Sequence, residues 1–339
     1  KACININSAS KGQEIHITIV KFGYLGRDVA VENALIDMYG KCDSLIEARE
    51  VFENVQERDV VSWTTIMSAY SEQEQSIETS ILFKRMQVEG TLPNAATFLC
   101  GLKACSDVGD TYKGSIMHAE IVGNGLFQKD FVIGDALINM YSKLGELLKS
   151  KEVFEKVPTL SKSSWNALLV GYAKHEQGKD ALECFHLMQR KGFMPDHVTF
   201  IYCLKACAIL EYSNIAADFH TEISRRGYQE TKTVVSNALI DMYSKFGLLD
   251  FAQAVFDKLQ ARDVVSWTAL IDGYTEYGRG DCAIKCYEQM RLENVPPNSI
   301  TFVCGLKACG SIGITNKGIK IHSELERKGF LPETNIVLG

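Results

Sequence analysis

The sequence repeats itself with a fixed period of 102 residues. The segment Val-Val-Ser-Trp-Thr-Ala-Leu-Ile-Asp-Gly-Tyr at 264–274 has counterparts at 60–70 and 162–172, and each copy begins 102 residues after the one before it. A fixed period of this kind is the signature of a repeat array, in which each unit packs on its neighbours. The 339 residues are therefore expected to form one array of small units rather than several independent globular domains.

Each period divides into three units that resemble one another. Tyr39, Tyr70 and Cys105 occupy equivalent places in successive units of 31, 35 and 36 residues. Partial units stand at the two ends of the chain, at 1–28 and 335–339. The complete units span 29–59, 60–94, 95–130, 131–161, 162–196, 197–232, 233–263, 264–298 and 299–334.

Each unit has the pattern of two helices. In unit 264–298, Trp267, Leu270, Ile271 and Tyr274 share one face of a first helix, and Ala283, Tyr287 and Met290 share one face of a second. All six prolines lie near unit ends, where helices stop, and no sustained alternation of apolar and polar residues predicts a strand. The sequence therefore predicts an all-α fold, an α-solenoid of tandem helix-turn-helix repeats.

Composition and charge limit the classes of function. Hydrophobic residues make up 46% of the chain and charged residues 23%, which is typical of a folded globular protein, and no apolar run is long enough to span a membrane. The net charge of −6 predicts weak non-specific binding to nucleic acid. The chain does not begin with Met or with a targeting peptide, so we expect it to be a fragment.

The 11 cysteines recur with the repeat rather than in pairs. Cys105, Cys207 and Cys309 occupy one place in successive periods and are expected to be buried thiols in a reducing compartment. The pairs Cys203–Cys207 and Cys282–Cys286 have helical spacing, but no histidine is placed to complete a zinc site. We therefore expect no metal and no other cofactor.

Two further motifs have both a functional and a structural interpretation. His118-Ala-Glu120 and its copies at 220 and 322 match half of a zinc deaminase signature, but the required Cys-x-x-Cys is absent, so a structural helix position is favoured. Trp63, Trp165 and Trp267 could stack on bases, but their place in the apolar stripe of a first helix favours core packing. Neither motif predicts catalysis.

The repeat segments resemble the pentatricopeptide repeat family. Val-Val-Ser-Trp-Thr-Ala-Leu-Ile-Asp-Gly-Tyr, followed by Ala283-x-x-x-Tyr287-x-x-Met290 and Pro297-Asn298, is similar to the consensus of that family. The succession of 35, 36 and 31 residues resembles its PLS subclass, with the 35-residue units as P, the 36-residue units as L and the 31-residue units as S. The resemblance covers essentially the whole chain.

The resemblance implies that the chain binds single-stranded RNA, one base per repeat. In the family, the fifth and the last residue of a unit face the base edge, Asn with Asp favours uridine, and Thr with Asn favours adenine. The implied Asn–Asp pairs are Asn33 with Asp59, Asn166 with Asp196, and Asn237 with Asp263. The implied Thr–Asn pairs are Thr64 with Asn94 and Thr268 with Asn298.

Some units depart from this pattern. Asp135 with Ser161 is an unusual pair, and its base is left open. The 36-residue units hold Leu99, Ile201 and Val303 at the reading position, where an aliphatic side chain cannot select a base by hydrogen bonding. Asn and Asp at unit boundaries also have a purely structural interpretation, because both are ordinary helix caps.

The family also implies packing and phosphate contacts. The second residue of a unit packs against the base, which assigns this role to Val61, Val234 and Val265, whereas Ser163 replaces the valine of its unit. A lysine near the end of the first helix meets the phosphate, and Glu72 and Glu276 hold that place in two of the 35-residue units. The lysines at this place are Lys41, Lys143, Lys174 and Lys245.

The first hypothesis is that the chain is the RNA-recognition tract of an RNA-processing factor of the mitochondrion or the chloroplast. C-to-U editing is the kind of processing that this hypothesis favours. The expected partner is single-stranded organellar RNA, with a deaminase domain or an accessory editing protein supplying chemistry that this tract lacks. No DNA and no membrane partner is expected. The alternative is a protein-binding helical scaffold, which the acidic charge favours slightly. A third possibility is that the 36-residue units bind an accessory protein.

Overall fold

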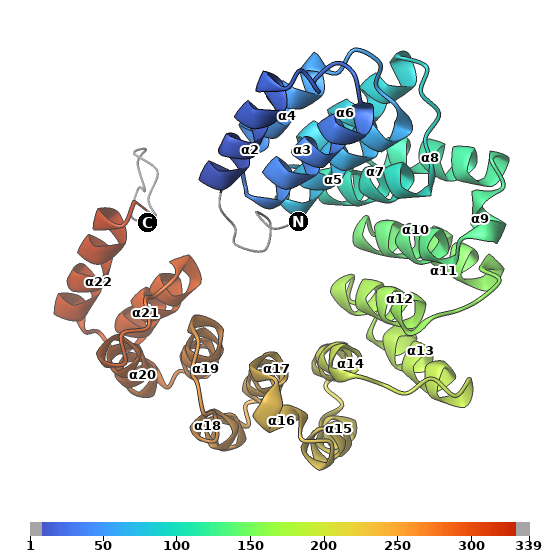
Figure 1. Ribbon diagram of the computed structural model, residues 1–339. Coiled ribbons are helices and arrows are strands. Elements are labelled where there is room, and N and C mark those ends of the chain that lie inside the picture. The colour runs from blue at the N-terminus through green and yellow to red at the C-terminus, as the bar shows by residue number, and fades with distance from the viewer. Residues whose placement is uncertain (1–8, 330–339) are drawn as a thin grey trace. The chain divides into compact units, whose positions relative to one another are not determined.

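The computed structural model describes residues 9–329, and in these residues every regular element is a helix (Figure 1). The prediction of an all-α fold is thereby confirmed. Residues 335–339, Cys3 and Pro332 lie outside the described residues. The first helix of each hairpin is α3 (Val29–Lys41), α5 (Val60–Glu72), α7 (Ala95–Val108), α10 (Phe131–Lys143), α12 (Lys162–Lys174), α14 (His197–Leu210), α17 (Thr233–Lys245), α19 (Val264–Glu276) or α21 (Ser299–Ser311).

Second helices alternate with these first helices along the chain. They are α4 (Leu45–Asn54), α6 (Ser76–Val88), α8 (Thr111–Gly123), α11 (Leu147–Lys156), α13 (Gly178–Arg190), α15 (Ser213–Arg225), α18 (Leu249–Asp257), α20 (Gly280–Leu292) and α22 (Thr315–Arg327). Helix α2 (Ala9–Lys21) precedes the first hairpin, and the short helices α9 (Leu126–Lys129) and α16 (Tyr228–Thr231) follow α8 and α15. The first helices begin at the residues where the predicted units begin, while the division into repeats stays a prediction.

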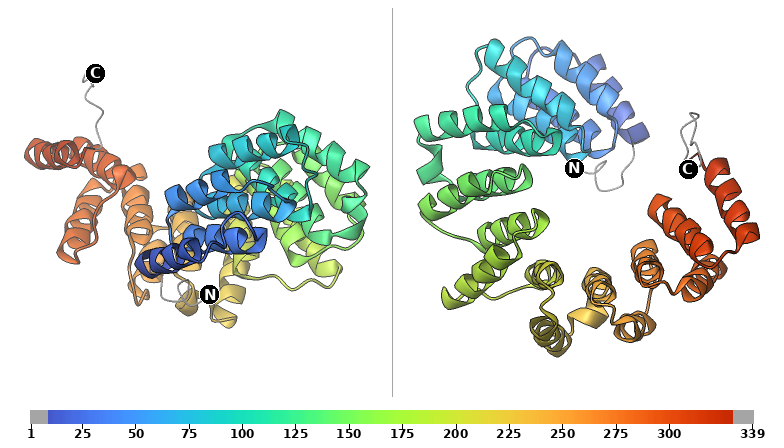
Figure 2. Two further views of the ribbon diagram at one scale, coloured as in Figure 1. Left: turned by 45° about the horizontal axis from the view of Figure 1, so that its top comes forward. Right: turned by 180° about the vertical axis from the view of Figure 1, so that it is seen from behind.

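The chain forms two compact units, one up to Gly171 and the other from Tyr172. In the first, α3 packs on α4 and on α5, and α7 packs on α5, α8 and α10. In the second, α17 packs on α14, α18 and α19, and α21 packs on α19, α20 and α22 (Figures 1 and 2). Within each unit the first helices thus form one layer and the second helices another, which is the α-solenoid arrangement that the sequence predicts.

Tryptophan joins one hairpin to the next. The rings of Phe52 and Trp63 meet edge to face with centroids 4.8 Å apart, and those of Phe154 and Trp165 do so at 4.6 Å. In the second unit Phe256 meets Trp267 at 4.5 Å. Edge-to-face pairs of buried rings stabilise a core beyond the area they remove from water. The tryptophans are at most 2% exposed, so their prediction as core residues is confirmed.

Histidine and cysteine motifs have structural places. His118 Nδ1 lies 3.1 Å from the Tyr141 hydroxyl, and His220 Nδ1 lies 2.7 Å from that of Tyr243, so two of the three histidines of the His-x-Glu motif link a second helix to the next first helix. Cys105, Cys207 and Cys309 are buried as predicted, and burial raises the pKa of Cys105 to about 11 and that of Cys207 to about 12. Within residues 9–329, no three His, Cys, Asp or Glu side chains are grouped so that they could hold a metal ion.

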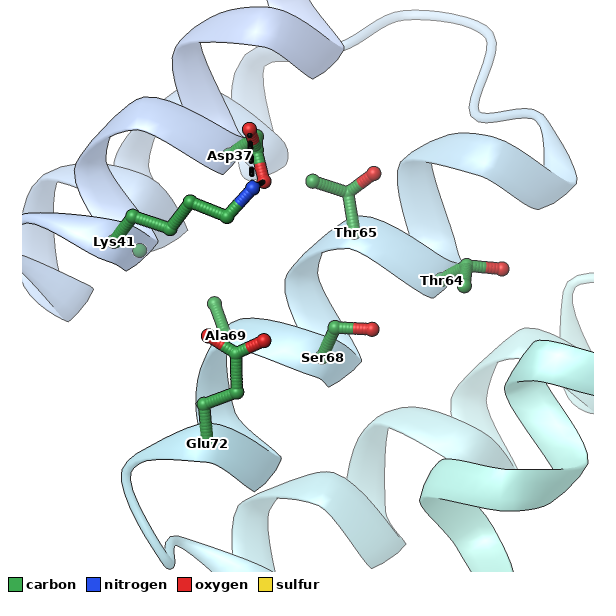
Figure 3. Close-up of a pocket in the computed structure, with 8 residues that line it drawn as sticks. Asp37, Lys41, Thr64, Thr65, Ser68, Ala69 and Glu72 are labelled. Carbon is green, nitrogen blue, oxygen red and sulfur yellow. Dashed lines mark hydrogen bonds and ion pairs between the residues drawn. The ribbon is translucent and has the colours of Figure 1, made fainter. Parts of the chain in front are cut away.

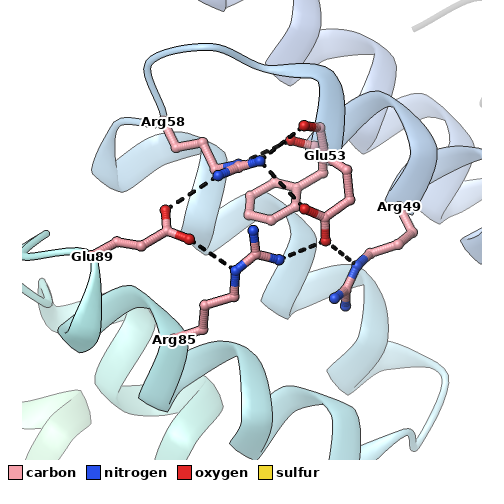
Figure 4. A network of polar contacts seen from close by, with 6 residues as sticks. Arg49, Glu53, Arg58, Arg85 and Glu89 are labelled. Carbon is pink, nitrogen blue, oxygen red and sulfur yellow. Dashed lines mark hydrogen bonds and ion pairs between the residues drawn. The ribbon is translucent and has the colours of Figure 1, made fainter.

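An arginine–glutamate network joins the second helices of the first two hairpins (Figure 4). Arg58 donates from Nη1 to Glu89 over 3.2 Å, and it also donates to the carbonyl oxygens of Phe52 and Glu53, over 3.1 and 2.9 Å, at the end of α4. Arg85 bridges Glu53 and Glu89 over 2.6 and 2.8 Å. The guanidinium of Arg58 lies 4.9 Å from the centroid of the Phe52 ring. The network therefore lies over the Phe52 ring, beside its contact with Trp63.

None of the helices in the described part of the chain combines the length and the hydrophobicity that a membrane span requires.

Candidate nucleic-acid interface

The predicted reading pairs with Asn and Asp meet where one first helix lies beside the start of the next. Asn33 on α3 donates from Nδ2 to Oδ1 of Asp59 over 3.4 Å. Asn237 on α17 donates from Nδ2 to both carboxylate oxygens of Asp263, over 3.2 and 3.4 Å. Two junctions that are distant in the chain therefore hold the same pairing of an amide donor with a carboxylate acceptor.

Within these pairs the aspartate is exposed and the asparagine is not. Asn33 and Asn237 are 8% and 7% exposed, whereas Asp59 and Asp263 are exposed at the surface of the first-helix layer. The amide oxygen Oδ1 of each asparagine is buried, and no donor within residues 9–329 reaches it. A buried acceptor without a donor costs about 1–3 kcal/mol of stability.

The predicted pairs with Thr and Asn are arranged differently. The hydroxyls of Thr64 and Thr268 donate back to the carbonyl oxygens four residues earlier in their helices, over 2.6 and 2.7 Å. Oδ1 of Asn94 accepts the Thr97 backbone N–H over 2.9 Å, and Asn298 accepts in the same way. Their Nδ2 groups have no acceptor within the described residues, so each asparagine can still donate.

Asp135 and Ser161 form a hydrogen-bonded pair in which the roles of donor and acceptor are exchanged: the residue on the first helix accepts and the last residue of the unit donates. The Ser161 hydroxyl donates to Oδ2 of Asp135 over 2.6 Å, and the Ser164 hydroxyl donates to Oδ1. Asn166 and Asp196, the remaining predicted pair, are both half-buried and belong to different compact units. The role of Ser164 was not predicted from the sequence.

The last residue of each predicted pair also caps the following first helix. Asp59, Asn94, Asp196, Asp263 and Asn298 are N-caps whose side chains accept a backbone N–H of the first turn. The structural interpretation of these positions as helix caps is therefore confirmed. Burial alone would raise the pKa of Asp59, but hydrogen bonds from the Ser62 N–H and hydroxyl and from Asn33 outweigh it and lower that pKa. The carboxylate is thus held in its charged, accepting form.

Valines at the second position line the same surface. Val61, Val234 and Val265 are 50%, 62% and 53% exposed. Ser163, which replaces valine, is also exposed. Exposed aliphatic side chains beside polar pairs provide apolar area on which a planar ring can pack.

Pockets lie between consecutive first helices. Between α3 and α5, a pocket of about 250 Å³ is lined by residues that include Asp37, Lys41, Thr64 and Glu72 (Figure 3). Its counterpart between α17 and α19 measures about 500 Å³ and includes Lys245. Between α10 and α12 a pocket of about 470 Å³ is lined by Asp135 and its neighbours.

Most of the predicted phosphate-binding lysines already have acidic partners. Lys41 pairs with Asp37 over 2.7 Å and Lys245 with Asp241 over 2.9 Å, each four residues apart on one helix. Lys143 pairs with Asp107 on the neighbouring first helix over 3.3 Å, and Lys174 is exposed. The hydrogen bond to Asp37 raises the pKa of Lys41, so this lysine stays charged. The four-residue spacing of Asp and Lys was a signal in the sequence that could have predicted two of these ion pairs.

The 36-residue units place other cations on this layer. Lys103 donates to the Ser71 carbonyl oxygen over 2.7 Å, and Lys307 pairs with Glu276 over 3.3 Å. At the reading position of these units Leu99 and Ile201 are half-buried, and Val303 is 48% exposed.

Two family models match the chain. The model described as PPR repeat family covers residues 161–209 and 262–311, and the model described as PPR repeat covers 33–60, 61–91, 135–159 and 234–264. Together they match more than half of the chain.

Curated relatives align with nearly all of this chain. A mitochondrial pentatricopeptide repeat-containing protein of Arabidopsis thaliana is 34% identical over 96% of this chain and 38% of its own length. Chloroplastic ones from the same plant are 34% identical over 92% of this chain and 38% of their length, and 32% identical over 97% and 61%. The chain thus spans about two fifths to three fifths of these relatives.

Solved structures share the fold. The crystal structure of the pentatricopeptide repeat protein PPR10 in complex with an 18-nt psaJ RNA element matches with a TM-score of 0.77 at 19% identity, over 94% of this chain and 47% of that chain. PPR10 from maize matches with a TM-score of 0.51 at 17% identity, over 90% of this chain and 54% of that chain. With the family models and the relatives, these similarities show that the chain belongs to the pentatricopeptide repeat family.

Proposed function

We propose that this chain binds single-stranded RNA on the surface of its first-helix layer. The observation that carries the proposal is the recurrence of the Asn–Asp pair, with the same donor and acceptor, at Asn33–Asp59 and Asn237–Asp263. An interface that needed only charge or apolar area would not require that pair at both junctions. The RNA in the PPR10 complex supports the choice of ligand.

The Asn–Asp and Thr–Asn pairs suit different bases because they leave different hydrogen-bonding groups available to a ligand. The middle position of the pairing edge of uracil is an N–H donor, which the acceptor-only carboxylate of Asp59 or Asp263 can meet. In adenine that position is a nitrogen lone pair, which the free Nδ2 of Asn94 or Asn298 can meet. We therefore assign uridine to the Asn–Asp units and adenine to the Thr–Asn units.

Read from 5′ to 3′, the proposed target is uridine, adenine, two positions without assignment, uridine, one position without assignment, uridine and adenine. The uridine in the middle of this series is assigned to Asn166 with Asp196. The positions opposite Leu99 and Ile201 are left without a base because these side chains form no hydrogen bonds. Val61, Val234 and Val265 would pack against bases, and Lys41, Lys143, Lys174 and Lys245 would meet phosphates.

The alternation of 31, 35 and 36 residues supports the PLS subclass, and the names of relatives support a mitochondrial or chloroplast location. We accordingly propose a recognition tract for RNA processing, with C-to-U editing as its most specific form. In this proposal the tract binds and does not catalyse, and a deaminase domain or an accessory protein acts on the bound RNA.

A protein-binding scaffold is the second candidate, favoured by the net charge of −6 and by the acidic partners of Lys41, Lys143 and Lys245. Selection from a random RNA pool at low salt separates the two functions, because electrostatic attraction between RNA and protein is then strongest. Retained RNAs that share the proposed base order support RNA recognition. A pool that is not retained, or is retained without any shared order, would favour the scaffold.

The Asn237–Asp263 pair offers a direct test of base assignment. Replacing Asn237→Thr and Asp263→Asn together converts this unit to the chemistry of the Thr268–Asn298 unit. The preferred base at the seventh position should change from uridine to adenine in a binding titration, while the preference at the first position, read by Asn33, should not. An unchanged preference at the seventh position would contradict the assignment.

A further inference from the structure

The junction between α10 and α12 presents different polar groups from the Asn33–Asp59 and Asn237–Asp263 junctions. In all three, the two residues of the reading pair form a direct hydrogen bond. At Asn33–Asp59 the first helix supplies the donor and the helix cap supplies the acceptor. At Asp135–Ser161 the first helix supplies a carboxylate, and the cap residue supplies the hydroxyl that donates to it over 2.6 Å. Exchanging the roles of the two positions changes what the pair can offer to a ligand.

The hydroxyl protons of Ser161 and Ser164 are both committed. A carboxylate only accepts, so the Ser161 and Ser164 hydroxyls must both donate when they contact Asp135. Ser161 Oγ also accepts the Ser164 backbone N–H over 3.2 Å, and Ser164 Oγ accepts the Ser161 backbone N–H over 2.9 Å. Each serine has one hydroxyl proton, so neither can donate to a ligand as well.

The carboxylate of Asp135 still has room to accept. Its two oxygens offer about four lone-pair sites, and the serines use two of them. Asp135 is half-buried and lines the pocket of about 470 Å³ between α10 and α12. Val132, 42% exposed, and the exposed Ser163 line the same pocket. A base that entered beside Val132 would therefore meet a charged group that accepts hydrogen bonds and does not donate them.

Guanine is the base whose pairing edge suits such a group. It carries two adjacent donors, N1–H and the N2 amino group, which a carboxylate can accept together as a bidentate pair. Uracil places its single N–H between two carbonyl oxygens, and those oxygens would face the carboxylate. Adenine and cytosine place an acceptor nitrogen beside their amino group, so only one hydrogen bond would form without repulsion.

We propose that the unit 131–161 selects guanosine through Asp135, with Ser161 and Ser164 as the residues that position its carboxylate. This inference rests on the proposed RNA-binding function and fills the fourth position of the proposed target. It makes Asp135 a specificity-determining residue rather than a position without preference.

The test measures binding of the unaltered chain to four RNAs that carry the proposed target and differ only at the fourth base. Guanosine should bind about tenfold more tightly than each of the other bases, which corresponds to one well-formed pair of hydrogen bonds. Equal affinity for the four RNAs, or preference for another base, overturns the inference. If uridine and adenine are still selected at the first and second positions, the proposed function stands while this inference fails.

Variants sharpen the result. Asp135→Asn together with Ser161→Asp reproduces the Asn33–Asp59 pair and should change the fourth-base preference from guanosine to uridine. Asp135→Asn alone should remove the preference for guanosine, and the preference at the first position is the internal control. Retention of the guanosine preference in a folded Asp135→Asn variant overturns the role of the carboxylate. If no RNA in the set is bound, both the inference and the proposed function fail.

Discussion

Two junctions in the first compact unit share a core and differ in polar contacts on both of their helix layers. We call the contact of α3 and α4 with α5 and α6 the N-terminal junction, and the contact of α10 and α11 with α12 the middle junction. The Phe–Trp contact is kept in both, at 4.8 Å for Phe52–Trp63 and 4.6 Å for Phe154–Trp165. The apolar contact is therefore the common structural element.

The polar groups differ on both layers. At the N-terminal junction Arg58 caps α4 and joins the glutamate network, whereas Leu160 stands at the equivalent place of the middle junction. On the first-helix layer the Asn33–Asp59 pair is replaced by Asp135–Ser161. Conserving the core fixes the spacing of the helices, and the polar residues at the surface can then vary without changing that spacing. A repeat array can change what it recognises in this way while keeping its fold.

The largest expected effect tests the part that the two junctions share. Trp63→Ala and Trp165→Ala each remove a buried indole and leave a cavity, which we expect to cost about 3–5 kcal/mol of unfolding free energy. Urea denaturation followed by circular dichroism would measure the loss for each variant. Similar losses support a common core, whereas a loss below about 1 kcal/mol at one junction would show that its contact is dispensable.

The second prediction concerns the arginine that only the N-terminal junction has. Arg58→Leu introduces the residue found at the middle junction and removes hydrogen bonds to the carbonyl oxygens of Phe52 and Glu53. We expect a loss of about 1–3 kcal/mol, because two hydrogen bonds from a charged donor to the end of α4 are lost together.

The reverse change is the matched control. Leu160→Arg should raise stability by less than Arg58→Leu lowers it, since the carbonyl oxygens at the end of α11 can accept from the new arginine but Lys191 occupies the sequence place of Glu89. A thermal melt distinguishes the two results. A gain as large as the loss in Arg58→Leu would contradict the view that the acidic partners of the network contribute to stability.

The features that belong to single helices could be predicted from the sequence. The starts of first helices, the buried tryptophans and the recurring cysteines follow from apolar periodicity and from a fixed period, which are properties of single helices and of their repetition. The positions of the reading pairs followed only from the family resemblance, since Asn and Asp at the same places are also helix caps.

What could not be predicted depends on contacts across helices. The direction of the hydrogen bond from Ser161 to Asp135, the part played by Ser164 and the pairing of Lys143 with Asp107 each require the relative placement of two or three helices. The boundary between compact units, at Gly171 and Tyr172, falls inside a helix whose repeat pattern is uninterrupted, so no sequence signal marks it.

The third prediction is a pH dependence of stability at the contact of α8 with α10, which precedes the middle junction and is linked by His118 and Tyr141. Burial lowers the pKa of His118 and of His220 below the ordinary value of 6.5, although Glu152 opposes the shift at His118. The unfolded chain therefore binds protons more readily than the folded chain just below that value. Stability should be full above about pH 6.5 and should fall as the pH drops through the lowered values.

Chemical denaturation between pH 7.5 and pH 5 would measure this slope, which arises from the burial of the two imidazoles. His118→Phe and His220→Phe each remove one titrating group, so each variant should make the slope shallower. Stability that increased on acidification would contradict the assignment of burial as the cause.

The smallest expected effect concerns charge on the first-helix layer. The N-terminal junction holds Lys41 and Glu72 at the two places where the sequence of the next period holds Lys143 and Lys174. Glu72 lines the pocket beside Lys41 and Asp37 (Figure 3), so it adds a negative charge where a phosphate would have to approach. Glu72→Lys should strengthen RNA binding by about two- to fivefold at low salt, which is the scale of an exposed charge pair. Because a phosphate contact releases counterions, the slope of log affinity against log salt should steepen by roughly one.

Glu78→Lys is the control: it lies on the second helix α6, in the other layer, and changes the net charge by the same amount. If both variants gain the same affinity, the effect is one of overall charge, and if only Glu72→Lys gains, the RNA backbone passes the first-helix layer at this junction.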